Sequence, residues 1–381
     1  MDALTTPLNW QRVRLGDIAY FLKGKGLSKS QVSSNAKHEC ILYGELFTYY
    51  DRVITNIKNF TNIYNNPILS LSNDVLMPSS DVTPNGLATA SCILKEGVIL
   101  GGDILIIRPN SNLLSGRFLA YCIVCDKNQV LSKVVGSTVY HLYAKDLKVF
   151  EIPLPPLNEQ IAIADILSDL DNYLHALRAL ILKKESVKKA LSFELLSQRK
   201  RLKGFNQNWQ KVRLGDIANY LTSNLSAEQI TQQGKIKVYD VNNFIGYTNT
   251  TFISDKPYIS IVKDGSVGRV RILPPKTNIL STMGALVANH KTTTEFLFYL
   301  LSNFDFKNFT SGSIIPHIYF KDYKEKTIFL PPLNEQIVIA DILSALDKEI
   351  ASLKNKKRQF ENIKKALNHD LMSAKIRVLK K

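Results

Sequence analysis

The chain has 381 residues, of which 45% are hydrophobic and 22% charged, and this composition excludes the disordered and fibrous classes. The 49 lysines and arginines exceed the 33 aspartates and glutamates, and the resulting net charge of +16 points to an acidic partner, either nucleic acid or an anionic membrane. Because no apolar run is long enough to cross a bilayer and the first residues lack the features of a signal peptide, we expect a cytoplasmic protein.

The first predicted domain, residues 1–153, has the pattern of a mixed α/β fold. Short segments rich in β-branched residues, bounded by Gly, Pro, Asn and Ser, predict strands. They read ECILYGEL, SLSNDVLMPSS, ASCILKEGVIL and GGDILIIRP. The segment SGRFLAYCIVC predicts a short buried helix near the end of this domain.

A long helix is predicted in residues 154–204, after the octapeptide LPPLNEQI that begins at Leu154. The two prolines mark its start, because proline fits neither a helix interior nor a strand ladder. Asn158 can cap the helix, and Glu159 lies where the helix dipole favours negative charge. At roughly 40 residues such a helix would be about 60 Å long.

A second globular domain, residues 205–329, is predicted to be mixed α/β as well. Its strand-like segments are KVYDVNNF, KPYISIVKDG and VGRVRILPP, and TEFLFYLLSN predicts a helix. The octapeptide LPPLNEQI then returns at Leu330 and opens a second predicted long helix in residues 330–381.

Apolar residues in both long helices recur at steps of four and three, which is the pattern of a coiled-coil seam. The predicted seam consists of Ile163, Leu167, Leu170, Leu174, Leu177, Ile181, Leu191, Leu195, Ile339, Leu343, Leu346, Ile350, Leu353, Phe360, Leu367 and Leu371. The pattern is interrupted by lysines, namely Lys184, Lys188, Lys357 and Lys364. We expect the two helices to pair antiparallel about a pseudo-two-fold axis, with independent helical hairpins and a dimerisation zipper as alternatives.

The two halves of the chain share four blocks of sequence. NWQRVRLGDIA returns as NWQKVRLGDIA, GSTVYHLYAKD as GSIIPHIYFKD, LPPLNEQIAIADILSDLD as LPPLNEQIVIADILSALD, and KKALSFELLS as KKALNHDLMS. The segments between these blocks barely match. Shared blocks indicate a shared framework, and divergent segments indicate that each half acts on a different target.

No catalytic, metal or cofactor motif emerges from the sequence. Cys122 and Cys125 have the spacing of half a zinc site, but no second pair follows, so packing in the core is favoured. The histidines lack ligand spacing, and the acidic residues are scattered. We therefore expect a chain that is not itself an enzyme.

Cationic and polar loops in both domains suit DNA binding, in which phosphate contacts position a protein and groove contacts read bases. The candidates in the first domain are Lys23, Lys25, Lys29, Tyr43, Glu45, Ser79, Ser80 and Asn85. Those in the second are Tyr239, Asn242, Asn243, Lys263, Ser266, Arg269 and Arg271. The repeated block adds Ser137, Thr138, His141 and Lys145, matched by Ser313, His317 and Lys321. For the two histidines, a structural role and a DNA contact both remain open.

The repeated LPPLNEQ that opens each long helix, alternating with two unlike domains over essentially the whole chain, resembles the specificity subunit of Type I restriction–modification systems. The resemblance implies two target recognition domains that each read one half of a bipartite site in double-stranded DNA, and an antiparallel coiled coil that docks two methyltransferase (modification) subunits. It also implies that S-adenosylmethionine, ATP and Mg serve partner subunits, including the restriction subunits, and not this chain. The alternatives are the specificity subunit of a Type II-like methyltransferase system and a coiled-coil scaffold that does not bind DNA.

Overall fold

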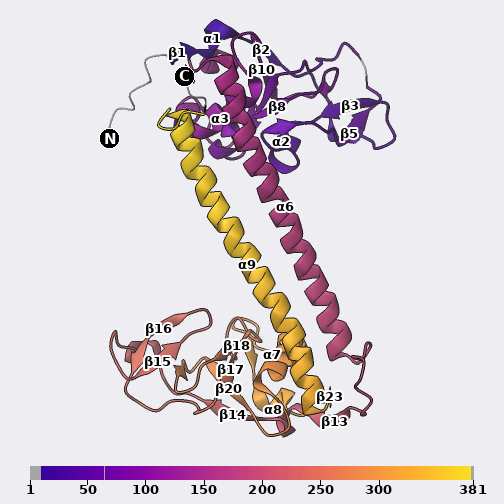
Figure 1. Cartoon of the computed structure of the whole chain (residues 1–381), viewed down its shortest axis with the longest axis vertical. Helices are drawn as coiled ribbons and strands as arrows, with labels where there is room; N and C mark the ends of the chain where they lie inside the picture. Colours follow the sequence, from indigo (N-terminus) through magenta and orange to yellow (C-terminus); the bar gives the residue numbers. More distant parts are fainter. Residues whose placement is uncertain (1–9, 64, 379–381) are drawn as a thin grey trace. The chain divides into compact units, whose positions relative to one another are not determined.

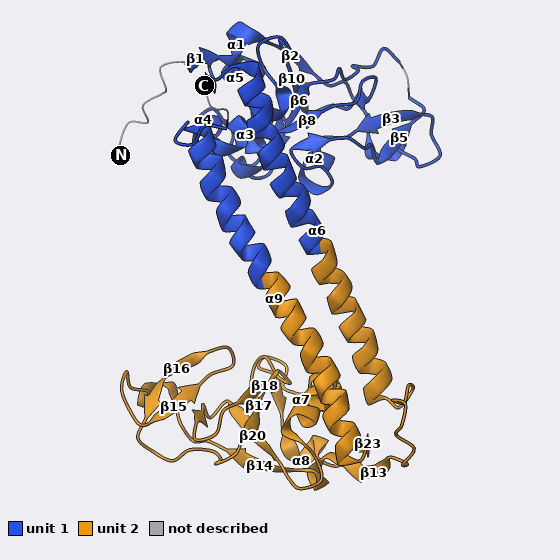
Figure 2. Ribbon diagram, in the orientation of Figure 1, with its two compact units in different colours: residues 1–178, 355–381 blue, residues 179–354 orange. Residues whose placement is uncertain are grey.

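A computed structural model describes residues 10–63 and 65–378 of the chain. The first nine residues of the predicted first domain and the last three of the predicted second helical region lie outside the described residues. The chain divides into two compact units, residues 1–178 with 355–381 and residues 179–354 (Figure 2). Each unit contains one globular domain and part of both long helices, whereas the predicted boundaries separate helices from domains.

The globular part of unit 1 is built on a five-stranded sheet with the order β2-β10-β6-β8-β4. All neighbours in it are antiparallel except β4 and β8. Its strands are β2 (Ala19–Lys23), β4 (Val53–Ile54), β6 (Asp74–Pro78), β8 (Ser91–Ile93) and β10 (Ile104–Pro109). A three-stranded sheet, β5-β3-β9, adds β3 (His38–Ile41), β5 (Asn59–Thr61) and β9 (Ile99–Leu100).

Two strand pairs and five short helices complete the globular part of unit 1. Figure 1 labels β1, α1, α2 and α3 among them. The pairs are β1 (Gln11–Arg14) with β12 (Glu151–Leu154), and β7 (Ser80–Asp81) with β11 (Tyr140–His141). The helices are α1 (Leu15–Ile18), α2 (Glu45–Thr48), α3 (Gly116–Cys125), α4 (Lys127–Leu131) and α5 (Ala144–Leu147). As predicted, α3 is buried, and the hydroxyl of Ser115 caps its first turn by accepting the N–H of Phe118.

The globular part of unit 2 repeats this plan with a four-stranded antiparallel sheet, β14-β20-β17-β18. These strands are β14 (Ala218–Thr222), β17 (Tyr258–Val262), β18 (Val270–Leu273) and β20 (Met283–Ala288). A second sheet, β16-β15-β19, contains β15 (Ile236–Tyr239), β16 (Phe244–Thr248) and β19 (Asn278–Ile279). The remaining elements are β13 (Gln210–Arg213), α7 (Thr294–Ser302), β21 (Thr310–Ser311), β22 (His317–Ile318), α8 (Phe320–Tyr323) and β23 (Thr327–Leu330).

The two long helices, α6 (Leu157–Leu196) and α9 (Leu333–Met372), are each 40 residues long, as predicted. Helix α6 begins directly after the prolines, where the carbonyl of Pro156 accepts the N–H groups of Glu159 and Gln160. The Oδ1 atom of Asn158 also accepts the N–H of Glu159 at 2.9 Å, so this first-turn donor is shared between a backbone and a side-chain acceptor. Among the described residues, no helix is long and apolar enough to cross a membrane.

Within each unit the two long helices pair antiparallel. In unit 1, Tyr173 packs against Phe360, with ring centroids 4.6 Å apart, and Arg178 pairs with Glu361. In unit 2, later residues of α6 again meet earlier residues of α9, in the pairs Glu185–Lys354, Lys184–Glu349 and Lys188–Asp347. Every residue of the predicted seam is buried or half-buried.

Two strand predictions in the first domain are wrong in extent. The segment ECILYGEL was predicted as one strand, but β3 ends at Ile41 and Glu45 already opens the helical turn α2. The segment ASCILKEGVIL forms two strands, β8 and β9, because the chain turns at Gly97, whose φ is +77°. Despite these differences, the mixed α/β fold class with an internal repeat is confirmed.

Candidate nucleic-acid interface

The LNEQ motif of α6 anchors this helix to the globular part of unit 1. The buried carboxylate of Glu159 accepts hydrogen bonds from the indole Nε1 of Trp10 at 3.3 Å and from Arg377 at 2.6 and 2.8 Å. The next residue, Gln160, accepts the N–H of Ser115 at 2.9 Å and so ties the start of α6 to the start of α3. A buried carboxylate is tolerated when charged or polar donors surround it, so these contacts assign the motif a structural role.

The same anchor recurs in unit 2 with the second LNEQ motif. The carboxylate of Glu335 accepts the indole N–H of Trp209 at 2.9 Å and two hydrogen bonds from Arg201. Gln336 accepts the N–H of Thr293, which caps α7 as Ser115 caps α3. The octapeptide is therefore repeated because each unit must attach its own helix in the same way.

The lysines that interrupt the seam are also structural. In unit 2, Lys188 pairs with Asp347 at 2.5 Å, and the hydroxyl of Tyr299 donates to the same carboxylate at 2.9 Å. In unit 1, Lys364 and Tyr121 converge on Asp171 in the same manner. Burial and the adjacent carboxylates raise the pKa of both tyrosines, which therefore remain hydroxyl donors.

A second repeated feature lies on the surface of each globular part, and we call it the His–Tyr–Lys cluster. It consists of His141, Tyr143 and Lys145 in unit 1, and of His317, Tyr319 and Lys321 in unit 2. In unit 1, the imidazole and phenol rings stack with centroids 6.2 Å apart, and the Lys145 Nζ lies 5.7 Å from the Tyr143 ring centroid. In unit 2 the corresponding distances are 6.4 and 5.5 Å. Each tyrosine and lysine is exposed, so each cluster offers a cation and an aromatic surface to a partner.

The loop before each cluster requires glycine. Gly136 and Gly312 have φ values of +119° and +90°, a region that favours glycine. A Cβ atom would lie 2.1 Å from the carbonyl oxygen of Val139 in unit 1, and 2.3 Å from that of Ile315 in unit 2. The repeated GS thus sets a tight loop whose tip is exposed in both units; in unit 2 this includes Ile314, which is 92% exposed.

The two cluster histidines have different partners. The Nδ1 atom of His141 lies 2.9 Å from the hydroxyl of Ser80, where β11 pairs with β7. The Nδ1 atom of His317 lies 2.7 Å from the carboxylate of Asp264. Both imidazoles are therefore held by their own unit through Nδ1, which supports a structural role, although the rings remain only half-buried.

The divergent loops beside the clusters differ in chemistry. In unit 2, Arg269 and Arg271 both donate to Asn242, at 2.9 Å each, and Arg271 lies over the ring of Tyr239. Unit 1 has no such arginine pair among its described residues. Its corresponding segment carries exposed aromatic residues such as Tyr43, which packs edge-to-face against Phe47.

Two predicted contacts in unit 1 are buried and therefore poorly placed to reach DNA. Glu45 is 5% exposed and accepts hydrogen bonds from the Asn59 side chain and the Leu42 N–H. Burial raises the pKa of Glu45, while these two hydrogen bonds lower it. Ser79 is also buried and donates its N–H to the carbonyl of Asp103.

The other predicted residues lie at the surface of their units. Those exposed are Lys23, Lys25, Lys29, Tyr43, Asn85, Ser137, Thr138, Lys145, Asn242, Asn243, Ser266, Arg269, Ser313 and Lys321. Those half-buried are Ser80, His141, Tyr239, Lys263, Arg271 and His317. Two of the exposed lysines already have partners, because Lys23 pairs with Asp103 and Lys25 donates to the carbonyl of Asn66. The structure groups the rest mainly around the two clusters and around Asn242.

Sequence reasoning missed the two cluster tyrosines, Tyr143 and Tyr319. Their signal was present, since both stand two residues after the repeated histidine. Reasoning also missed Trp10 and Trp209, whose repetition in the NWQ blocks marks the anchor for the LNEQ glutamates.

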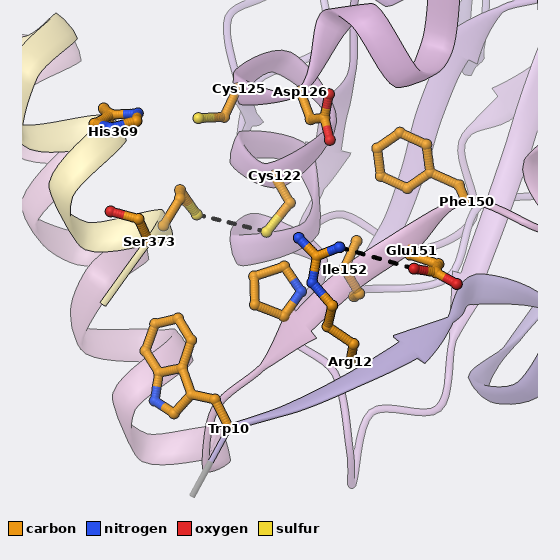
Figure 3. Close-up of a pocket in the computed structure, with 12 residues that line it drawn as sticks. Trp10, Arg12, Cys122, Cys125, Asp126, Phe150, Glu151, Ile152, His369 and Ser373 are labelled. Carbon is orange, nitrogen blue, oxygen red and sulfur yellow. Dashed lines mark hydrogen bonds and ion pairs between the residues drawn. The ribbon is translucent and has the colours of Figure 1, made fainter. Parts of the chain in front are cut away.

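A cavity of about 280 Å³ in unit 1 brings Cys122 and Cys125 opposite His369 of α9 (Figure 3). Burial raises the pKa of both thiols, which disfavours metal-binding or nucleophilic thiolates. Among the described residues, no cluster of His, Cys, Asp or Glu could hold a metal ion. In unit 2, Leu300 stands where α3 has Cys122, in agreement with a packing role for this position.

Comparisons with known proteins agree with the repeat. The family of the Type I restriction modification DNA specificity domain matches residues 7–184 and 206–362. The chain is 25% identical to the Type I restriction enzyme MjaVIII specificity subunit of Methanocaldococcus jannaschii, over 99% of this chain and 95% of that protein.

Solved structures share the fold. The S subunit of a Type I restriction–modification system from M. genitalium aligns with a TM-score of 0.69 at 20% identity, over 97% of this chain and 98% of that one. A chain from a structural study of complex assembly and conformational transition in the type I restriction–modification system aligns with a TM-score of 0.54 at 17% identity, over 97% and 98%. The family match, which covers both halves of the repeat, shows that this chain belongs to the specificity subunits of Type I restriction–modification systems.

Proposed function

We propose that this chain reads a two-part site in double-stranded DNA, with one globular domain for each half of the site. The observation that carries the proposal is that each unit combines a cluster shared with the other unit and loops that differ from those of the other unit. The His–Tyr–Lys cluster is repeated almost exactly in composition and spacing, whereas the loops around it differ. Features common to both domains cannot distinguish two different sequences, whereas the unlike loops can.

The repeated clusters suit the DNA backbone. Lysine and histidine side chains donate to phosphate oxygens, and such contacts set register without reading sequence. The exposed Lys145 and Lys321 are the principal phosphate donors in this proposal. The net charge of +16 agrees with a polyanionic partner.

The divergent loops suit the bases. Side chains that reach base edges must differ between two domains that recognise different base sequences. In unit 2 these side chains surround Asn242, and in unit 1 they include Tyr43 and Asn85.

The long helices suit the docking of two methyltransferase subunits. Apolar side chains remain exposed on the long helices at positions outside the seam. Because the seam already pairs the two helices, these further apolar side chains are available for a protein partner. In unit 2 the set consists of Leu180, Leu182, Val187, Phe193, Leu333, Ile337 and Val338. In this proposal the docked subunits bind S-adenosylmethionine and modify DNA, restriction subunits use ATP and Mg, and this chain supplies recognition alone.

Single-molecule methylation sequencing tests the proposal, in cells that carry this chain together with a methyltransferase subunit of the same system. The expected result is one modified motif made of two short words with a fixed gap. A continuous motif, or no modification that depends on this chain, would contradict it.

Salt dependence and co-purification separate the alternatives. DNA affinity that falls steeply with salt supports phosphate contacts, whereas weak, salt-insensitive binding favours a scaffold that does not act on DNA. Co-purification of a methyltransferase with a helicase–nuclease indicates a Type I complex, and a methyltransferase alone favours the Type II-like alternative.

A further inference from the structure

Two arginines of unit 2 converge on one loop residue. The Nη2 atom of Arg269 donates to the side-chain Oδ1 of Asn242 at 2.9 Å, and the Nη1 atom of Arg271 donates to its backbone carbonyl, also at 2.9 Å. The guanidinium of Arg271 lies 5.2 Å from the ring centroid of Tyr239. A guanidinium has five N–H donors, so each arginine keeps donors for a partner outside the chain.

The loop that receives these arginines is itself fixed. The carboxylate of Asp240 accepts the N–H groups of Asn242 and Asn243 at 2.7 and 2.6 Å. Asp240 is thereby committed to the turn, and the described residues show no ion pair between either arginine and a carboxylate. Two neighbouring guanidinium groups without a neutralising charge favour an electron-rich ligand.

The hairpin of β17 and β18 carries both arginines and also supports the His–Tyr–Lys cluster of unit 2. The turn between β17 and β18 contains Asp264, whose carboxylate contacts His317. The next residue in the turn, Gly265, donates its N–H to the carbonyl of Pro316. The turn closes where Val262 donates its N–H to the carbonyl of Arg269 at 3.0 Å. A duplex whose backbone contacts the cluster therefore passes close to Arg269.

We propose that Arg269 and Arg271 read guanine in the half-site of the second domain, and that Asn242 positions them. Guanine presents two acceptors, O6 and N7, in the major groove, and the guanidinium fork matches them. Asn242 was a candidate DNA contact from sequence, but its Oδ1 already accepts from Arg269, so a positioning role fits better than direct base reading. This inference rests on the proposed function and adds the identity of the base.

Two observations favour a base contact over a phosphate contact. Each guanidinium is held in a defined direction, by Asn242 and in one case by Tyr239, which suits a directional partner. The pair is also specific to unit 2. Arg271 lies opposite Ser260 on the central strand β17, and the corresponding place in unit 1, opposite Leu76 of β6, holds the buried Ser91.

The test is methylation sequencing of the full complex with wild-type chain, R269A, R269K, R271A and N242A, and with K321A as a control that removes one charge from the cluster. We expect the wild-type motif to contain guanine in one half. R269A should lower discrimination at one guanine by about five- to 150-fold while the other half stays unchanged. R269K should relax the same position because lysine lacks the fork, and N242A should relax it too. K321A should reduce modification at all sites evenly and leave the motif intact.

Several outcomes would overturn the inference without touching the proposed function. One is a bipartite wild-type motif with no guanine in the affected half. Another is an even loss of modification in both R269A and R271A, as expected of K321A, which would assign the arginines to phosphates. If R269A abolishes modification altogether, R269K decides, because an intact motif in R269K refutes base reading and a relaxed one supports it. Absence of any bipartite motif in the wild type would refute the proposed function itself.

Discussion

Arg201 and Glu335 form a two-point ion pair, in which Nε and Nη2 donate to Oε1 and Oε2 at 3.2 and 3.0 Å. The glutamate side chain is only 1% exposed and also accepts the indole N–H of Trp209 at 2.9 Å. Removing it would leave two donors without their acceptor in a site that water barely reaches. This carboxylate therefore ties the start of α9 to the segment that follows α6, through Arg201, and to the residue before β13, Trp209.

Replacing Glu335 by alanine should destabilise the chain. We expect the free energy of unfolding to fall by about 3 kcal/mol, at the low end for a broken buried pair because Arg201 is still 30% exposed. Glu325→Ala is the matched control, since Glu325 pairs with Arg213 at 2.7 Å but is 53% exposed, and we expect a loss below about 1 kcal/mol. Urea unfolding followed by circular dichroism measures both, and equal losses would argue against the anchoring role.

Replacing the cluster lysines should weaken DNA binding without altering the sequence read. Lys145→Ala and Lys321→Ala should each lower affinity for every duplex and reduce the slope of log affinity against log salt by about one. Lys365→Ala removes the same charge from an exposed position of α9 and serves as the control. A change in the recognised motif, or a slope equal to that of the control, would contradict the assignment to phosphates.

Gly312→Ala should disturb the cluster loop of unit 2 without unfolding the unit. The substitution forces a side chain into a left-handed conformation, 2.3 Å from the carbonyl oxygen of Ile315. Because this loop leads directly to His317, we expect DNA affinity to fall by several-fold while the thermal unfolding midpoint drops by only a few degrees. Gly265→Ala provides a comparison, since Gly265 also has a positive φ, +83°, but open space around it.

The sequence allowed the framework to be predicted because repeats and periodicity are local signals. The two 40-residue helices, their start after the prolines, and the seam follow from spacing alone. The role of the LNEQ glutamates did not follow, because Glu159 meets Trp10 and Arg377, which are far away in sequence. The lysines in the seam also looked like interruptions, because their partners are distant in sequence. Lys188 pairs with Asp347 of α9, and Tyr299 of α7 donates to the same carboxylate.

Candidate contacts were harder to predict than the framework. A loop residue such as Glu45 looks available for DNA in a sequence, and only the turn α2 and the side chain of Asn59 bury it. Conversely, Arg269 and Arg271 looked like separate candidates, and folding brings both to Asn242. Burial and convergence depend on contacts between distant segments, which patterns along the chain do not encode.

The pH dependence of stability should reveal the buried carboxyl group of Glu45. Burial raises its pKa above the ordinary 4.5, so the folded state binds a proton more readily than the unfolded state. Charged Glu45 is therefore a cost at neutral pH, and the cost disappears as pH falls toward 4.5. We expect the difference in unfolding free energy, wild type minus Glu45→Gln, to increase over that range. A constant difference would contradict the raised pKa, and an altered DNA motif in Glu45→Gln would favour the original prediction of a DNA contact.

The length of the long helices should set the gap between the two words of the site. Along the chain, α6 lies between the two sets of loops that we propose contact DNA, and α9 pairs with α6, so both helices must lengthen together. An insertion of seven residues in each preserves the seam. We propose inserting seven residues near Arg178 in α6 and near Glu361 in α9, which pair at 3.1 Å and so mark one level of the seam. At 1.5 Å per residue the insertion adds about 10 Å, or about three base pairs of B-DNA. Methylation sequencing should then show the same two words with a gap longer by about three base pairs. Insertion in one helix alone breaks the seam and should abolish modification, whereas an unchanged gap after the double insertion would rule out the helices as spacers.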